Sequence, residues 1–434
     1  MRRTGWVAAL ALAFVCAGNG VFAEGPAEQS EGSTFRVFGV LHTGITMQFT
    51  DMQDDGPFIF GGSTERADPL YLLIKASWAS AGNNFGIDSG VILRGSYVET
   101  NTIDQSFNVV RSIRLDNTWG WIRFLEGMFT LYGGLGEWEY DFLTPGPIDS
   151  NLNMDGLGMV LVARPLLDMP GHDLRVGLSA FVGGGHDVLL NEGKYIFSAA
   201  YQFNDTFEVV GNFAFRQYGP RFFADPESIN YCPQRARDHR INIGFNFLGL
   251  SHLGFSRIAM DAEMRDLGGG RTSIRDPIAE WGREGSTVYP LFLGQRITWG
   301  SGPLNLDATF RQTIRIGDDH EDYAPALKFM LRASYALNDF IVPRIGLLYV
   351  MNSRVFGDTP GDMRFHEGLI IDECERDQAG FGFLAGVQFR PFGGDRTIIE
   401  VGYSLKMDLG RDAQPGRGRS TVDHGVYVSM SIHF

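Results

Sequence analysis

Val426-Tyr-Val-Ser-Met-Ser-Ile-His-Phe434 ends the chain and alternates apolar with polar residues up to its last position. Because successive side chains of a β-strand point to opposite faces, one face would carry Val426, Val428, Met430, Ile432 and Phe434. The other face would carry Tyr427, Ser429, Ser431 and His433. An apolar face toward lipid and a polar face toward water is the pattern of a transmembrane β-strand. An ordinary amphipathic strand would alternate in the same way, so other features must decide between the two.

The N-terminus has the features of a secretory signal peptide. Arg2 and Arg3 precede an apolar run that begins at Trp6, and Val21-Phe22-Ala23 fits a small-residue cleavage site. We therefore expect residues 1–23 to be a signal peptide and residues 24–32 a short lead before the first strand. Cys16 leaves lipidation as a minor alternative, because the residues before it lack the small side chain that such a site requires.

The composition favours one β-rich domain that meets lipid. Beyond the signal, no apolar run reaches the roughly 18 to 20 residues of a membrane-spanning helix. The chain has 56 Gly, 34 Phe and 13% aromatic residues, and strand-like segments recur from Thr34 to Phe434 without a linker. These features predict a single barrel domain over residues 33–434, with rings such as Trp78, Trp119 and Trp121 at the membrane interfaces.

Period-two alternation predicts strands throughout this domain. We place them at 34–49, 69–80, 84–99, 109–123, 128–136, 154–164, 173–183, 194–203, 206–218, 238–248, 253–264, 288–299, 303–316, 325–337, 340–352, 378–391, 395–408 and 421–434. The segments between them alternate strictly between short and long. Outer-membrane barrels have tight periplasmic turns and longer outer loops, whereas a soluble sandwich has no reason to sort its loops by length. The expected fold is all-β, a transmembrane antiparallel barrel of about 16 to 18 strands.

The terminal strand resembles that of Gram-negative outer-membrane proteins, whose assembly machinery reads a last strand that ends in Phe. The resemblance implies an outer-membrane location, with Phe434 as an assembly signal. It also implies outer-membrane lipid and the barrel-assembly machinery as partners. Nothing in the sequence indicates a nucleic-acid partner.

The inward faces of the predicted strands are rich in cations. We expect the pore to be lined by Arg36, Arg94, Arg114, Arg296, Arg311, Arg315, Lys328, Arg332 and Arg344. Hairpin register should bring Arg296 near Asp307, Arg311 near Lys328, and Arg332 near Arg344. The long loops are predominantly acidic. Such a basic wall would focus a field on passing anions, although the lumen charges could equally pair among themselves and select nothing.

The segment from Trp119 to Gly136 resembles the fourth and fifth strands of the trimeric general porins. In that family the next loop folds into the lumen and narrows it, and three chains associate. The resemblance implies a homotrimer and a constriction loop at 137–149 that carries Glu137, Glu139, Asp141 and Asp149. A loop that lies over the barrel rim is the alternative.

We predict a porin-like outer-membrane channel for the passive diffusion of small polar or anionic solutes. A surface adhesin or ligand-binding barrel and a fatty-acid-type transporter are the alternatives. We expect no enzyme, no cofactor and no metal site, because His, Ser, Cys and acidic residues are not found at recognisable catalytic or ligating spacings. Cys232 and Cys374 fall in predicted outer loops, where they form either a disulfide or two free thiols.

Overall fold

The computed structural model describes residues 33–50, 58–61, 70–96, 108–136, 142, 144–147, 157–182, 193–204, 206–217, 237–264, 289–316, 326–351, 379–408 and 422–434. The predicted signal peptide, the short lead and both Cys232 and Cys374 lie outside these ranges. Within them, no helix is long and apolar enough to cross a membrane.

The described chain forms a single sheet of 19 strands. The strands are β1 (Thr34–Thr50), β2 (Phe58–Gly61), β3 (Leu70–Ala79), β4 (Phe85–Ser96), β5 (Asn108–Phe124), β6 (Phe129–Gly136), β7 (Leu157–Ala163), β8 (His172–Val182), β9 (Gly193–Phe203), β10 (Phe207–Gln217), β11 (Arg237–Phe247), β12 (Phe255–Met264), β13 (Tyr289–Ser301), β14 (Leu304–Ile316), β15 (Ala326–Tyr335), β16 (Ile341–Met351), β17 (Ala379–Phe389), β18 (Thr397–Asp408) and β19 (Val422–His433). A short 3-10 helix, η2, covers Ser251–Leu253 between β11 and β12.

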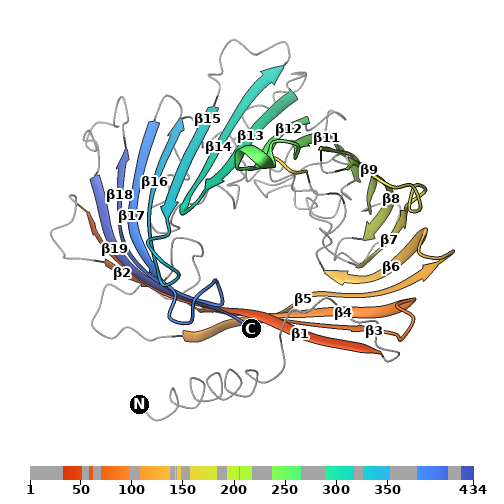
Figure 1. Ribbon diagram of the computed structural model, residues 1–434, viewed down its shortest axis with the longest axis horizontal. Coiled ribbons are helices and arrows are strands. Elements are labelled where there is room, and N and C mark those ends of the chain that lie inside the picture. Colours follow the sequence, from red (N-terminus) through yellow and green to blue (C-terminus); the bar gives the residue numbers. More distant parts are fainter. Residues whose placement is uncertain are drawn as a thin grey trace, which may run out of the picture.

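The sheet closes on itself as an antiparallel barrel of 18 strands (Figure 1). Closure is made by β1, which pairs with β3 along Thr34–Thr43 and with β19 along Val40–Thr50. The remaining strand, β2, pairs only with Ile45–Gln48 of β1. The prediction of a transmembrane barrel of 16 to 18 strands is confirmed, and each predicted strand matches an observed one to within three residues at either end. The short β2 was missed, because it lies in a stretch predicted to be loop.

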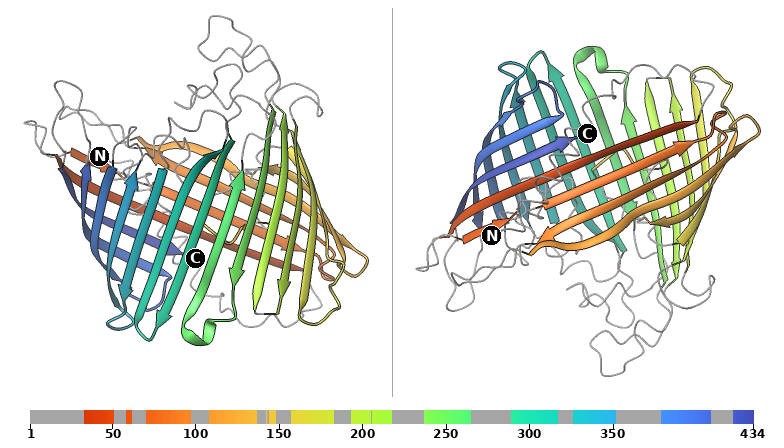
Figure 2. Two further views of the ribbon diagram at one scale, coloured as in Figure 1. Left: turned by 90° about the horizontal axis from the view of Figure 1, so that it is seen from above. Right: turned by 90° about the horizontal axis from the view of Figure 1, so that it is seen from below.

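The short connections link alternate strand pairs and lie at one end of the barrel (Figure 2). One of them, residues 336–340, is held by Asn338, whose side-chain oxygen accepts hydrogen bonds from the backbone N–H groups of Phe340 (2.8 Å) and Ile341 (2.9 Å). An Asn side chain that bonds the backbone two and three residues ahead is a typical turn device. The strands therefore reverse within a few residues at this end.

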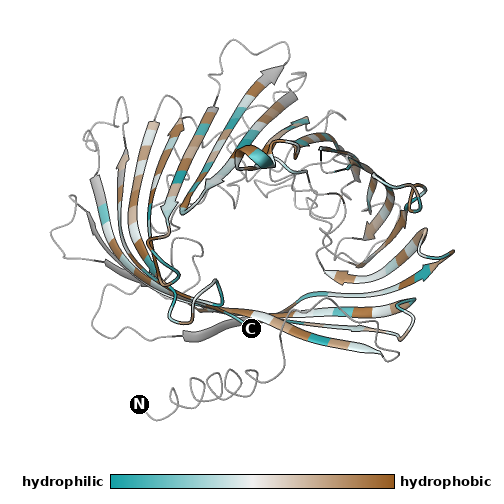
Figure 3. Cartoon of the chain, in the orientation of Figure 1, coloured by the Kyte–Doolittle hydropathy of each residue, from teal (hydrophilic) through white to brown (hydrophobic). Residues whose placement is uncertain are grey.

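Hydrophobic and hydrophilic residues alternate along many of the strands (Figure 3). Successive side chains of a strand point to opposite faces, so this alternation gives the wall two different faces. On β10, Val210, Asn212 and Ala214 are buried on the inward face, while Phe213 is exposed on the outward face. The pairing of β5 with β4 shifts register between Gly90 and Val91 and again between Arg94 and Ser96. Gly90 pairs with Asn117 but Val91 pairs with Leu115, so Asp116 is an extra residue in a β-bulge.

The bulge changes which residues of β5 face inward. Leu115 is 56% exposed on the lipid side, whereas Trp119, four residues later, is 1% exposed and packs in the lumen. Two residues of equal parity would share a face in a regular strand. The prediction of Trp119 as an interface ring is therefore wrong, because a one-residue insertion turned its side chain inward.

Phe434 completes the seam of the barrel. Its N–H donates to the Gly39 carbonyl (3.0 Å) and its carbonyl accepts from the Gly39 N–H (2.7 Å). The Phe434 ring lies over Gly39, where an added Cβ would come within 2.6 Å of the ring. The last residue thus joins β1 to the end of β19 through both its backbone and its ring.

Deleting Phe434 should lower the yield of folded barrel. The deletion removes two backbone hydrogen bonds, each worth about 0.5–1.5 kcal/mol net, and uncovers Gly39 at the seam. The folded fraction is measured as the heat-modifiable band in unheated gels. Phe392→Ala is the control, since that ring is 81% exposed in a short connection and should leave the folded fraction unchanged. An unaltered fraction in the Phe434 deletion would contradict a role in closure.

Candidate functional site

The outward surface is that of a membrane protein. Exposed apolar side chains cover the middle of the strands, among them Ile113, Leu178, Phe197, Phe213 and Ile345. Rings gather on the outward side at the end with the short connections, including the pairs Trp78–Phe85 and Phe124–Phe129, whose centroids are 5.7 and 5.6 Å apart. Closure of the sheet pairs backbone groups within the bilayer, and an apolar exterior with an aromatic girdle suits lipid and its interfaces. The chain is an outer-membrane β-barrel.

Of the nine predicted pore residues, six are on β13 to β16. Arg311 of β14 and Lys328 of β15 are direct cross-strand partners. Arg332 is the cross-strand partner of Asp307. Arg344 is opposite Ser334 and therefore lies diagonally from Arg332. We call Arg296, Arg311, Lys328, Arg332 and Arg344 the basic strip.

Of the other predicted pore residues, Arg315 is on β14, a strand of the strip, and the remaining three lie on other strands. Arg36 is exposed on β1 near the end with the short connections. Arg94, Arg114 and Arg315 lie on β4, β5 and β14, but their side chains are outside the described part of the chain. The structure thus brings five of the nine predicted residues together.

Two ion pairs anchor the basic strip to the wall. The Arg296 guanidinium donates to both oxygens of Asp307, from Nε at 3.1 Å and from Nη2 at 3.0 Å. Such a two-pronged contact fixes the plane of the guanidinium as well as its position. Arg344 Nε lies 2.7 Å from Glu400 Oε1. The predicted proximity of Arg296 and Asp307 is confirmed.

Glu400 is the centre of a buried polar network on the lumen side of β16 to β19. It accepts hydrogen bonds from the Tyr427 hydroxyl (2.5 Å) and from Gln388 Nε2 (3.2 Å), in addition to its ion pair with Arg344. Tyr427 reaches Glu400 by lying across Gly402, where an added Cβ would clash with its ring. Sequence reasoning missed this network, because Tyr427 appeared only as one of the polar residues of the last strand.

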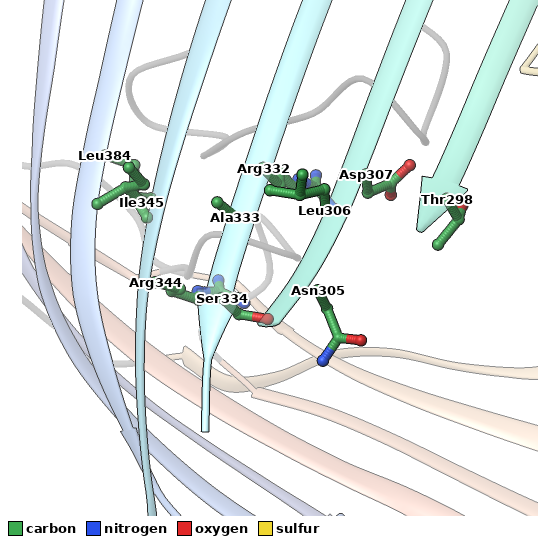
Figure 4. Close-up of a pocket in the computed structure, with 10 residues that line it drawn as sticks. All are labelled: Thr298, Asn305, Leu306, Asp307, Arg332, Ala333, Ser334, Arg344, Ile345 and Leu384. Carbon is green, nitrogen blue, oxygen red and sulfur yellow. The ribbon is translucent and has the colours of Figure 1, made fainter. Parts of the chain in front are cut away.

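A hollow of about 190 Å³ opens beside the strip (Figure 4). Arg332, Arg344 and Asp307 contribute charged groups to it, and Asn305, Ser334 and Thr298 contribute neutral polar groups. Guanidinium donors beside small hydroxyl and amide groups suit a carboxylate or phosphate. The hollow thus combines two guanidinium groups with the Asp307 carboxylate, small polar groups and the apolar residues Leu306, Ala333, Ile345 and Leu384.

Another part of the lumen wall, on β5 and β7 to β10, is apolar and buried. Trp119, Val160, Phe181, Ile196 and Val210 lie on the inward faces of β5 and β7 to β10 and form one buried cluster. Its remaining strand members are Val162, Ala200 and Ala214, with Tyr132 packed against it. Phe142, from the connection between β6 and β7, belongs to the same cluster and is 5% exposed. An apolar surface inside a water-filled barrel would be costly unless something covered it.

The described part of that connection lies inside the barrel. The Phe142 carbonyl accepts a hydrogen bond from Asn212 Nδ2 of β10 (2.9 Å). Thr144 and Pro145 pack on Gly244 of β11, and Gly146 lies against the Asp261 carboxylate of β12. The loop therefore crosses the inward faces of β8 to β12. The predicted constriction residues Glu137, Glu139, Asp141 and Asp149 flank this segment but lie outside the described residues.

Comparisons with known proteins return likenesses of overall shape only. No family model and no curated protein matches the chain. Among solved structures, OprD of Pseudomonas aeruginosa is 10% identical over 94% of this chain and 98% of its own, with a TM-score of 0.46. An anion-selective porin from Comamonas acidovorans is 10% identical over 93% of this chain and 100% of its own, with a TM-score of 0.41. A loop-deletion mutant of OmpT, an outer membrane protein of Vibrio cholerae, is 11% identical over 93% and 100%, with a TM-score of 0.43.

The Arg344–Glu400 pair predicts a non-additive response to mutation. Arg344→Gln leaves the buried Glu400 carboxylate without its cation and should lower the stability of the barrel by about 1–3 kcal/mol. Adding Glu400→Gln removes the orphaned charge, so the double variant should be more stable than Arg344→Gln alone. The measurement is urea unfolding followed by tryptophan fluorescence. Strictly additive single effects would contradict the coupling.

Proposed function

We propose that this barrel is an outer-membrane channel through which small anionic solutes diffuse passively. The observation that supports the proposal best is the basic strip on β13 to β16, which concentrates five cations on one arc of the inner wall. An 18-strand barrel is too wide for its own wall side chains to fill, so a water-filled passage is expected beside the inward loop. A basic wall in a low-dielectric tube raises the local concentration of anions.

Ion pairing within the strip is compatible with this role. An arginine has five N–H donors, and a two-pronged contact with one carboxylate uses two of them. A passing carboxylate or phosphate can exchange with a wall carboxylate for these donors. We propose small organic acids and inorganic anions as the solutes, with the hollow beside Arg332 and Arg344 as a resting point.

Three further expectations remain proposals. Phe434 would be read by the barrel-assembly machinery, the chain would assemble as a homotrimer, and the constriction loop would carry Glu137, Glu139, Asp141 and Asp149. We also propose that the barrel transports rather than catalyses.

Neutralising the strip should reduce the preference for anions. In a planar bilayer with a salt gradient, the variant with Arg311, Lys328, Arg332 and Arg344 all replaced by Gln should show a reversal potential closer to zero than the wild type. The charges, rather than the shape of the wall, attract the anions, and Gln keeps much of that shape. Arg344→Gln alone should cost about 1–3 kcal/mol of stability, so only barrels that give the heat-modifiable, folded band are recorded.

The matched control removes the same number of charges elsewhere. Arg123, Arg164, Arg390 and Arg396 lie at or beside the short connections. Replacing these four with Gln should move the reversal potential much less. A barrel that inserts but never conducts would contradict the proposed function, and equal shifts in both variants would contradict the role of the strip.

A further inference from the structure

We propose that Gly177, Gly244 and Asn212 form a seat that clamps the loop at 142–147 onto β8 to β12, and that this seat determines how much of the lumen stays open. We call these three residues the loop seat. The inference rests on the proposed channel function and adds the positioning residues that define the passage. All three contact the loop, and each would act by positioning it.

Gly177 makes room for the Phe142 ring. A Cβ on Gly177 would lie 2.4 Å from one ring carbon and 2.7 Å from another, closer than real Cβ atoms come to any neighbour. Glycine in the interior of a strand weakens the strand, and it often marks a place where another part of the chain comes close. Gly177 is in the middle of β8, away from any turn. Its absent side chain is therefore explained by the ring that occupies the space.

Gly244 does the same for the next part of the loop. A Cβ there would lie 2.7 Å from Pro145 Cδ and 2.9 Å from Thr144 Cβ. Pro145 and Pro147 are both buried, and Gly146 between them lies against Asp261. Two prolines restrict the backbone, so the loop arrives at the wall with little conformational freedom to lose. Both partners therefore favour this contact: the wall leaves space at Gly244, and the prolines restrict the backbone of the loop.

Asn212 fixes the loop backbone between these two glycines. Its hydrogen bond to the Phe142 carbonyl is buried, and a buried carbonyl without a donor would be costly. Cross-strand register places Gly177 beside Ser198, Ser198 beside Asn212, and Asn212 beside Asn242. The seat thus follows one line across four neighbouring strands, with Gly244 two residues from Asn242.

The loop excludes solvent from this line. Ser198 and Asn242 face the lumen of a wide barrel, yet both are 0% exposed. Among the described residues, the Ser198 hydroxyl and both polar atoms of the Asn242 amide have no hydrogen-bond partner. Polar side chains on the lumen side are buried in this way only when other residues cover them. Phe142 and Thr144–Pro147 are the described loop residues that contact the neighbouring Gly177, Asn212 and Gly244. Solutes are thereby confined to the part of the lumen that faces the basic strip.

A buried reporter tests the seat without measuring ion flow. Ser198→Cys, in a background with Cys232→Ser and Cys374→Ser, places a thiol under the loop with little change in size. A membrane-impermeant cationic thiol reagent should label it slowly in the folded barrel. Adding Gly177→Leu or Gly244→Leu should speed labelling by about tenfold or more, the factor that corresponds to about 1.4 kcal/mol in favour of the open loop. Only the heat-modifiable, folded form is scored.

Gly211→Leu is the matched control. Gly211 is next to Asn212 on β10, and a Cβ there meets nothing within 4 Å. It should leave labelling slow, while Asn212→Ala, a variant that adds no bulk, should speed it. Fast labelling of Ser198→Cys without any seat variant, or slow labelling in all three seat variants, would overturn the proposal. Labelling as expected in a barrel that does not conduct would contradict the proposed channel but not the seat.

Discussion

Closure of the sheet is the constraint on which the other features depend. In the hydrocarbon of a bilayer each unpaired backbone N–H or C=O costs several kcal/mol, so a sheet that crosses it must have no free edge. Here β1 supplies the last pairing, with β3 on one side and β19 on the other. Once the ring is closed, alternation sends one set of side chains to lipid and the other to the lumen. Every functional residue is placed by that division.

A closed ring of 18 strands encloses a wide lumen, and glycines determine where the large inward side chains lie within it. Large inward rings lie flat on the wall over a glycine of an adjoining strand. Trp119 lies over Gly134, Phe181 over Gly158, and Tyr427 over Gly402. A ring that lies along the wall buries its apolar faces without crossing the passage. Phe142 over Gly177 repeats the pattern, except that this ring comes from a loop.

Much of the barrel wall could be predicted from the sequence, because residues that are close together in the chain determine the strands and their turns. Period-two alternation located the strands, and sorted connection lengths gave their direction. Hairpin register placed Arg296 beside Asp307, since both lie on strands joined by a two-residue connection. The bulge at Asp116 could not be found in this way, because one extra residue reverses the faces without changing the composition. The prediction of Trp119 was wrong for this reason.

The inward loop depends on contacts that are distant in the sequence. Phe142 contacts Gly177 and Asn212, and Gly146 contacts Asp261. The alternation of residues within a single strand cannot predict these contacts. Resemblance to a porin hairpin suggested an inward loop but not where it would rest. Interior strand glycines such as Gly177 and Gly244 were the available signal. Glycine weakens the interior of a strand, so its presence there often marks a place where another part of the chain comes close.

We propose that the loop covers one side of the lumen and leaves the passage along the basic strip. Current through Ser334→Cys and Ser198→Cys barrels, recorded before and after addition of a bulky thiol reagent, tests it most directly. Ser334 lines the hollow beside Arg332 and Arg344, whereas Ser198 lies under the loop. The account predicts a stepwise fall in conductance for Ser334→Cys and no change for Ser198→Cys. A fall in conductance for Ser198→Cys, with Ser334→Cys unaffected, would contradict it.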